Sequence, residues 1–86
     1  MANKNFSILS TTWVAITDLI TPEDDKNYFI QNRGPFMVIA VESASAPTTE
    51  AGICIPAYKT LKYVKGSNTL YLKSFGSSEI NISDED

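Results

Sequence analysis

Apolar residues recur at every second position along this chain, in short runs separated by clusters of Gly, Pro, Asn, Asp and Ser. Such alternation is typical of β-strands with one buried face, and the intervening residue types form turns. The pattern predicts strands at residues 12–17 (with a backward extension through 6–9), 28–32, 36–41, 53–55, 60–65, 69–75 and 80–83. No window shows a helical period, so we expect at most one helical turn, around residues 21–26, where Thr21 and Pro22 suit a helix start.

About seven short strands at a spacing of ~8–12 residues predict an all-β fold, a small antiparallel β-sandwich or barrel. The turn Asn32-Arg33-Gly34-Pro35 predicts that strands 28–32 and 36–41 pair as a hairpin. Both faces of 36–41 are apolar, which predicts a central strand covered on each side. The stretch 42–52, rich in Ser, Ala and Thr, predicts a long surface loop.

The chain length of 86 residues fits a single domain, residues 1–86. The polar start and the acidic end lack the apolar residues that would hold them on a core. We therefore expect frayed termini at residues 1–5 and 83–86.

Period-2 alternation divides the apolar residues into two sets. The larger set should fill the core: Val14, Ile16, Tyr28, Ile30, Val38, Ala40, Ile53, Ile55, Leu61, Tyr63, Leu70, Leu72, Ile80 and Ile82. The opposite phase carries Trp13, Phe29, Met37, Ile39, Val41, Tyr71 and Phe75. This second set is too apolar for a face that meets only water, so we expect at least part of it to contact another subunit. The alternative is that a small barrel covers these side chains with its long loops.

Charge and hydropathy narrow the choice of partners. Ten acidic and seven basic residues give a net charge of −3, whereas nucleic-acid-binding modules need a basic face. The longest apolar run, residues 36–41, is far shorter than the ~20 residues that span a bilayer. The first residues lack the basic and apolar regions of a signal peptide. We expect no nucleic-acid partner, no membrane association and synthesis in a cytoplasm.

Candidate catalytic and metal-binding residues are few. The sequence has no histidine and one cysteine, Cys54, which we interpret as a small buried hydrophobe between Ile53 and Ile55. The dense carboxylates, Glu23 to Asp25, lack the spacing of a calcium loop and are interpreted as a solvated loop. We therefore expect no enzyme activity, no cofactor and no metal site. A glycan-binding module remains an alternative, because Trp13, Tyr58 and Tyr71 partly fit an aromatic sugar platform.

A longer pattern covers residues 28–83. It includes Tyr28-Phe29-Ile30-Gln31-Asn32, a Gly turn, Ala40-Val41-Glu42, Ser45-Ala46-Pro47, Gly52-Ile53, Pro56, Leu61, Gly66, Leu70-Tyr71-Leu72 and Ser74. This pattern resembles small β-rich structural proteins of tailed bacteriophages, of the head-decoration, tail or fibre-associated type.

The resemblance implies a virion component that binds a repeated lattice of other virion proteins, often as a trimer or another symmetric oligomer. The leading hypothesis is therefore a non-enzymatic phage structural protein located in the virion. A glycan-binding module for a host surface, or a phage-encoded inhibitor of a host protein, are the alternatives.

Overall fold

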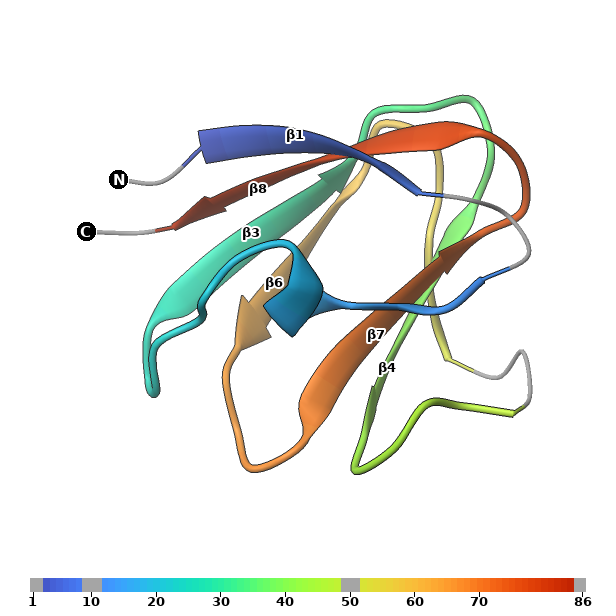
Figure 1. Cartoon of the computed structure of the whole chain (residues 1–86). Helices are drawn as coiled ribbons and strands as arrows, with labels where there is room; N and C mark the ends of the chain where they lie inside the picture. Colours follow the sequence, from blue (N-terminus) through green and yellow to red (C-terminus); the bar gives the residue numbers. More distant parts are fainter. Residues whose placement is uncertain (1–2, 9–11, 49–51, 85–86) are drawn as a thin grey trace.

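The computed structural model describes residues 3–8, 12–48 and 52–84, which form two four-stranded antiparallel sheets packed face to face (Figure 1). Sheet A has the order β1-β8-β3-β6, with β1 (Asn3–Ile8), β8 (Ser78–Asp84), β3 (Asn27–Asn32) and β6 (Thr60–Val64). Sheet B has the order β2-β7-β4-β5, with β2 (Val14–Ala15), β7 (Thr69–Ser74), β4 (Val38–Ser43) and β5 (Ile53–Ile55). The all-β fold is confirmed. Within the described residues neither sheet closes on itself, so the structure is a sandwich and not a barrel.

The chain passes from one sheet to the other at most of its connections. The predicted hairpin between 28–32 and 36–41 is therefore wrong: β3 pairs with β6 and β8, whereas β4 pairs with β5 and β7. The crossing places β3 and β4 in different sheets, and both strands contribute buried residues to the same core cluster. The predicted central position is confirmed, because β4 lies between β7 and β5. Coverage on each side holds only in part: Val38, Ile39 and Ala40 are buried, whereas Phe36 and Met37 are exposed.

The N-terminal third differs from the predicted strand 12–17. Only β2 is extended there, and the chain then forms the short 3₁₀ helix η1 (Ile16–Asp18). The amides of Leu19 and Ile20 donate to the carbonyl of Ile16, at 3.0 and 2.9 Å. This turn buries Ile16 in the core and redirects the chain from sheet B towards sheet A. The helical turn lies here rather than at residues 21–26.

The chain ends pair with each other where the sequence predicts fraying. β1 runs antiparallel to β8, from Asn3 opposite Ser83 to Ile8 opposite Ser78 (Figure 1). Asp84 is buried, and its Oδ2 forms an ion pair with Nζ of Lys26 at 3.1 Å. Fraying is thus wrong for 3–5 and 83–84, because strand pairing and a salt bridge hold them. Residues 1–2 and 85–86, residue 9 of the predicted strand extension, and residues 49–51 of the predicted loop lie outside the described part of the chain.

Most of the predicted core is buried between the sheets. The buried members are Ile16, Tyr28, Ile30, Val38, Ala40, Ile55, Tyr63, Leu70, Leu72, Ile80 and Ile82. Val14 and Leu61 are half-buried and pack against this cluster. Ile53 is the exception, with 61% of its surface exposed, because β5 is the last strand of its sheet. Cys54 is also exposed rather than buried, because it lies on the face of this edge strand that points away from the core.

One buried polar side chain connects both sheets. Asn32 ends β3 with no exposed surface, and its Nδ2 donates to the carbonyls of Phe36 and Ile55 at 2.7 and 3.0 Å. Its Oδ1 accepts from the amide of Gly34 at 3.0 Å and from the hydroxyl of Ser78 at 2.9 Å. Its four hydrogen bonds thereby join β3 and β8 of sheet A to the β3–β4 turn and to the end of β5 in sheet B.

The turn after β3 requires glycine at position 34. A Cβ placed on Gly34 would lie 2.8 Å from the Cα of Ser78, closer than side-chain carbons approach a neighbouring backbone. The glycine lets the turn fold tightly against β8, which brings its amide within reach of Asn32.

Replacing Asn32 with alanine should lower the free energy of unfolding by about 3 kcal/mol, because buried donors and acceptors lose their partners. Urea denaturation followed by Trp13 fluorescence measures this change. The control is Gln31→Ala, which removes one exposed bond of 3.4 Å to the carbonyl of Tyr58 and should cost less than about 0.5 kcal/mol. Equal losses in the two variants would contradict the role assigned to Asn32.

A second prediction concerns the turn between β5 and β6. The amide of Lys59 donates to the carbonyl of Pro56 at 3.1 Å, and Tyr58 has a positive φ of 63° with a side chain that is 65% exposed. Tyr58→Gly should raise the free energy of unfolding by about 0.5–1 kcal/mol, because the Cβ strain outweighs the added freedom of the unfolded chain. Ala57→Gly, one residue earlier, should lower it. A stability loss in Tyr58→Gly would show that the ring contributes more than the strain costs.

Candidate functional site

The outward side of sheet B gathers most of the residues that the sequence assigns to a contact surface. In β4 and β7 these residues alternate with core residues, and Val41 lies opposite Tyr71 while Ile39 lies opposite Lys73. The amide of Phe75 donates to the carbonyl of Met37 at 3.0 Å, which continues this ladder by one row. Six of the seven predicted residues therefore share one surface, the outer apolar face: Trp13, Met37, Ile39, Val41, Tyr71 and Phe75.

Trp13 joins this face from the residue before β2. The ammonium of Lys73 lies 5.9 Å from the centre of the Trp13 ring, a distance suited to a cation–π interaction. The contact covers part of the indole that a sugar platform would need. Tyr71 shares this face, whereas Tyr58 lies in the β5–β6 turn, so the three aromatic residues of the glycan alternative do not form one platform.

Exposure on the outer apolar face is concentrated at one end. Ile39 is only 2% exposed, while Met37 and Phe75 are 38% and 42% exposed. Phe36 adjoins them at 45% exposure, and a Cβ on Gly76 would lie 2.6 Å from Cε2 of the Phe36 ring, so the ring packs flat against this glycine. Here the β3–β4, β5–β6 and β7–β8 connections come together around the Asn32 hydrogen bonds (Figure 1). Buried hydrogen bonds thus hold the turns beside the exposed residues Phe36, Met37 and Phe75.

Phe29 is the predicted contact residue that the fold separates from the others. It lies in β3 of sheet A, opposite Lys62 on one side and Ser83 on the other. Its side chain is half-buried on the outer surface of the opposite sheet. Strand alternation identifies residues that point outwards, but which sheet each strand joins is settled by long-range pairing.

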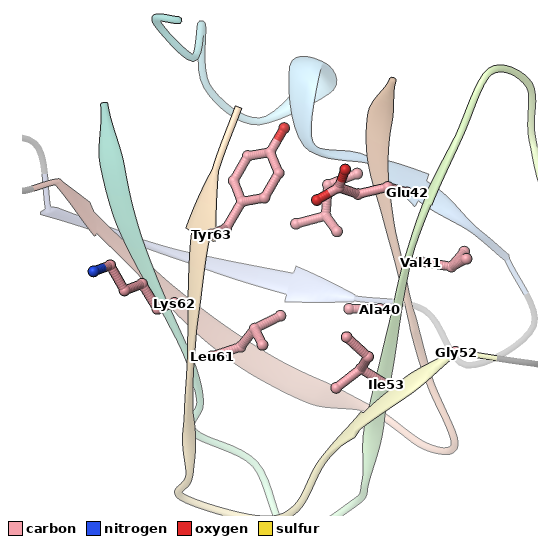
Figure 2. Close-up of a pocket in the computed structure, with 9 residues that line it drawn as sticks. Ala40, Val41, Glu42, Gly52, Ile53, Leu61, Lys62 and Tyr63 are labelled. Carbon is pink, nitrogen blue, oxygen red and sulfur yellow. The ribbon is translucent and has the colours of Figure 1, made fainter. Parts of the chain in front are cut away.

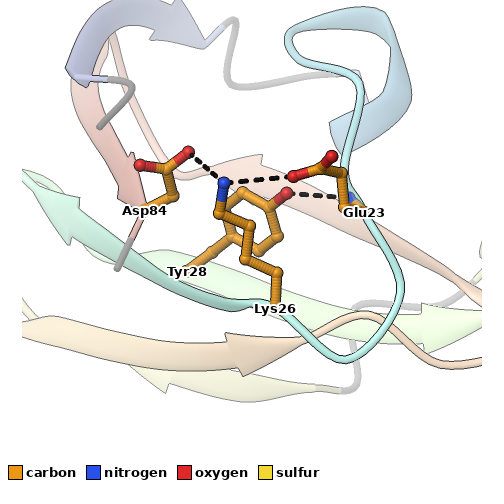
Figure 3. Close-up of polar contacts among 4 residues, drawn as sticks. All are labelled: Glu23, Lys26, Tyr28 and Asp84. Atoms are coloured by element: carbon orange, nitrogen blue, oxygen red, sulfur yellow. Dashed lines mark hydrogen bonds and ion pairs between the residues drawn. The ribbon is translucent and has the colours of Figure 1, made fainter. Parts of the chain in front are cut away.

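Two carboxylates of the 23–25 cluster pair with different lysines. Lys26 contacts Glu23 at 3.0 Å and Asp84 at 3.1 Å, and the amide of Glu23 donates to the hydroxyl of Tyr28 at 2.7 Å (Figure 3). Asp24 pairs with Lys65 at 2.7 Å. The described residues contain no group of three His, Cys, Asp or Glu side chains placed to hold a metal ion. Lys26, through its contacts with Glu23 and Asp84, links the loop before β3 to the end of β8.

A cleft that the sequence does not predict opens between the edge strands of the two sheets. It has a volume of about 270 Å³ and is lined by Ala40, Val41, Glu42, Gly52, Ile53, Leu61, Lys62, Tyr63 and Leu70 (Figure 2). Tyr63 and Glu42 lie at one end of the cleft, and Ile53 and Leu61 lie at the other. Burial, and secondly the charge of Glu42, raise the pKa of the Tyr63 hydroxyl. The sequence offers one signal of this open edge. Ile53 alternates as a core residue does, but it lies on a strand of only three residues that Pro56 follows directly.

No family model, curated protein or solved structure matches this chain. Among the described residues the helical element is η1, three residues long, so no helix is long enough to span a membrane. The structure defines the chain as a small antiparallel β-sandwich with an apolar outer face and an open edge.

The lysine contacts predict how stability depends on pH. Hydrogen bonds to Glu23 and then Asp84 raise the pKa of Lys26, the bond to Asp24 raises that of Lys65, and burial raises that of Tyr63. All three groups hold their protons to higher pH in the folded chain than in the unfolded one. Their contribution to stability is complete below the ordinary pKa values of ~10 and is lost as the pH rises above them.

Urea denaturation between about pH 7 and 11 tests this expectation. The free energy of unfolding should stay level near neutral pH and fall above about pH 10. Lys26→Met keeps the apolar stem but removes the ammonium, so this variant should be less stable at neutral pH and decline less steeply above pH 10. An identical alkaline decline in both proteins would rule out Lys26 as a source of it.

Proposed function

We propose that this protein is a non-enzymatic structural subunit that acts by assembling with copies of itself and with other proteins. The observation that carries this proposal is the outer apolar face, where six of the residues assigned to contact lie on one sheet and the exposed ones meet at one end. Contiguous apolar surface on a folded domain is typical of a protein interaction site. The Asn32 hydrogen bonds hold the backbone next to this face, so its residues would lose little conformational freedom on binding.

The small number of exposed apolar residues at this end favours an assembly of several identical subunits. Fully burying a Phe or Met side chain contributes roughly 1.5–3 kcal/mol, and Phe36, Met37 and Phe75 are already more than half covered in the single chain. One contact of this kind is weak, but several identical subunits that bind together gain avidity. A symmetric oligomer bound to a lattice uses such contacts well, and we favour a trimer.

The proposed setting is the virion of a tailed bacteriophage, as a capsid-decorating or tail- or fibre-associated component. Support for this setting comes from the resemblance of residues 28–83 to small β-rich phage structural proteins. The compact sandwich and its apolar face are compatible with that role. Mass spectrometry of purified phage particles from a strain that carries the gene would test it, and absence of the protein from the particles would reject it.

Light scattering coupled to size-exclusion chromatography tests assembly directly. We expect a mass three times that of one chain, and a single-chain mass for the double variant Met37→Asp, Phe75→Asp, whose exposed positions allow folding. The control is Val64→Asp, which charges a residue of 43% exposure on β6 of the other sheet and should leave the trimer intact. A single-chain mass for the unaltered protein at all concentrations would overturn the proposal.

A further inference from the structure

The sandwich core is open along one edge. Ile53 and Ile55 share a face of β5, since they lie opposite the buried residues Ala40 and Val38 of β4. Ile55 is 2% exposed, but Ile53 is 61% exposed although it occupies the same inward phase. An inward residue with this much exposure indicates a gap in the layer that should cover it, because the other predicted core residues are buried or half-buried.

The dimensions of the cleft suit side chains better than a small molecule. Its volume of about 270 Å³ is below the ~300–1,000 Å³ of typical small-ligand sites. Leu61 and Tyr63 face it from β6, and Ile53 faces it from β5 (Figure 2). One or two aliphatic side chains placed between these residues would complete the core.

The backbone next to the cleft offers a place for a further strand. β6 is the last strand of sheet A, and its paired residues in the described chain lie in β3 on one side. It has five residues, compared with three in β5, which Pro56 follows directly. An edge strand with unpaired amides and carbonyls is a template for β-strand addition.

Charge along this edge indicates what kind of strand would fit. Thr60, Lys62 and Val64 form the exposed outward row of β6, and the ammonium of Lys62 points away from the cleft (Figure 2). Lys59, also exposed, precedes this row. On the inward side, the Glu42 carboxylate lies at the Tyr63 end of the cleft, which disfavours an acidic residue there. The outward row therefore suits acidic residues, and the inward row suits aliphatic ones.

We propose that the free edge of β6 binds an extended segment of a partner protein, in which aliphatic and acidic residues alternate. The segment adds a strand to sheet A, its aliphatic side chains enter the cleft beside Ile53 and Leu61, and its acidic side chains lie next to Lys62. Backbone hydrogen bonds supply affinity, and the alternation supplies specificity. A second copy of β6 is a poorer occupant, because antiparallel self-pairing about its central residue places Lys62 opposite Lys62.

The experiment uses the whole protein and a short synthetic peptide of alternating valine and glutamate. Binding is followed by two-dimensional NMR of the labelled protein and by titration calorimetry. We expect amide shifts along Thr60–Val64 and slower amide exchange there, because new hydrogen bonds form on β6. A peptide of the same composition, with its valines and glutamates in separate blocks, is the probe control.

Three variants locate the site. Ile53→Asp should weaken binding about tenfold or more, because a carboxylate then faces the cleft at a position exposed enough to keep the fold. Lys62→Glu should weaken it about fivefold, while Arg33→Glu, an equal charge change away from the cleft lining, should alter it less than about twofold. The double variant Met37→Asp, Phe75→Asp should bind the peptide normally, which separates this inference from the assembly proposal.

Several outcomes would overturn the inference. These are equal binding of the block peptide, peptide-induced shifts outside β6 and the cleft, or no shifts at millimolar peptide. Concentration-dependent shifts of β6 without peptide would assign the edge to a second copy instead. Shifts of Ile53 and Leu61 with a small apolar probe but not with the peptide would assign the cleft to a small ligand.

Discussion

The arrangement of this sandwich depends on the buried side chain of Asn32. Its amide and carbonyl groups satisfy four partners from the β3–β4 turn, the end of β5 and the start of β8. The backbone at the same residue is bonded to the β5–β6 turn, through the carbonyl of Lys59 and the amide of Tyr58. A fully satisfied polar network in a core is costly to break and specifies one geometry. Here it fixes where the chain crosses between the sheets.

The two ends and two edges of the sandwich are consequently unequal. The Asn32 end is held by buried hydrogen bonds and exposes Phe36, Met37 and Phe75. The opposite end has the ion pairs of Lys26 with Glu23 and Asp84. One side is bordered by β1 and β2, and the other by β5 and β6, where the cleft lies. A domain of 86 residues buries only a small core. A partner that covered the inward but exposed side chain of Ile53 would therefore add to the stability of the domain.

The two proposed contact regions differ in chemistry. The outer apolar face offers side chains of one sheet, and binding there would depend on shape and apolar burial. The β6 edge offers backbone hydrogen bonds, with Lys62 on its outward side and the cleft on its inward side. A subunit with both could join a symmetric assembly through its face and receive an extended segment of a neighbouring protein along its edge. These roles are compatible because the exposed residues Phe36, Met37 and Phe75 do not line the cleft, although Val41 belongs both to the outer apolar face and to the cleft lining.

Local alternation along the chain was sufficient to identify the all-β class, most strands and most core residues, because period 2 is a property of each strand by itself. It also identified Trp13, Met37, Ile39, Val41, Tyr71 and Phe75 as outward apolar residues. Tertiary structure alone decided which strands are neighbours, so it separated Phe29 from that set and β3 from β4. It also decided that Ile53 and Cys54 lie on an open edge, and that Asn32 bonds to Ile55 and Ser78 as well as to its own turn. Strand order and edge position arise from long-range pairing, which a short window of sequence does not record.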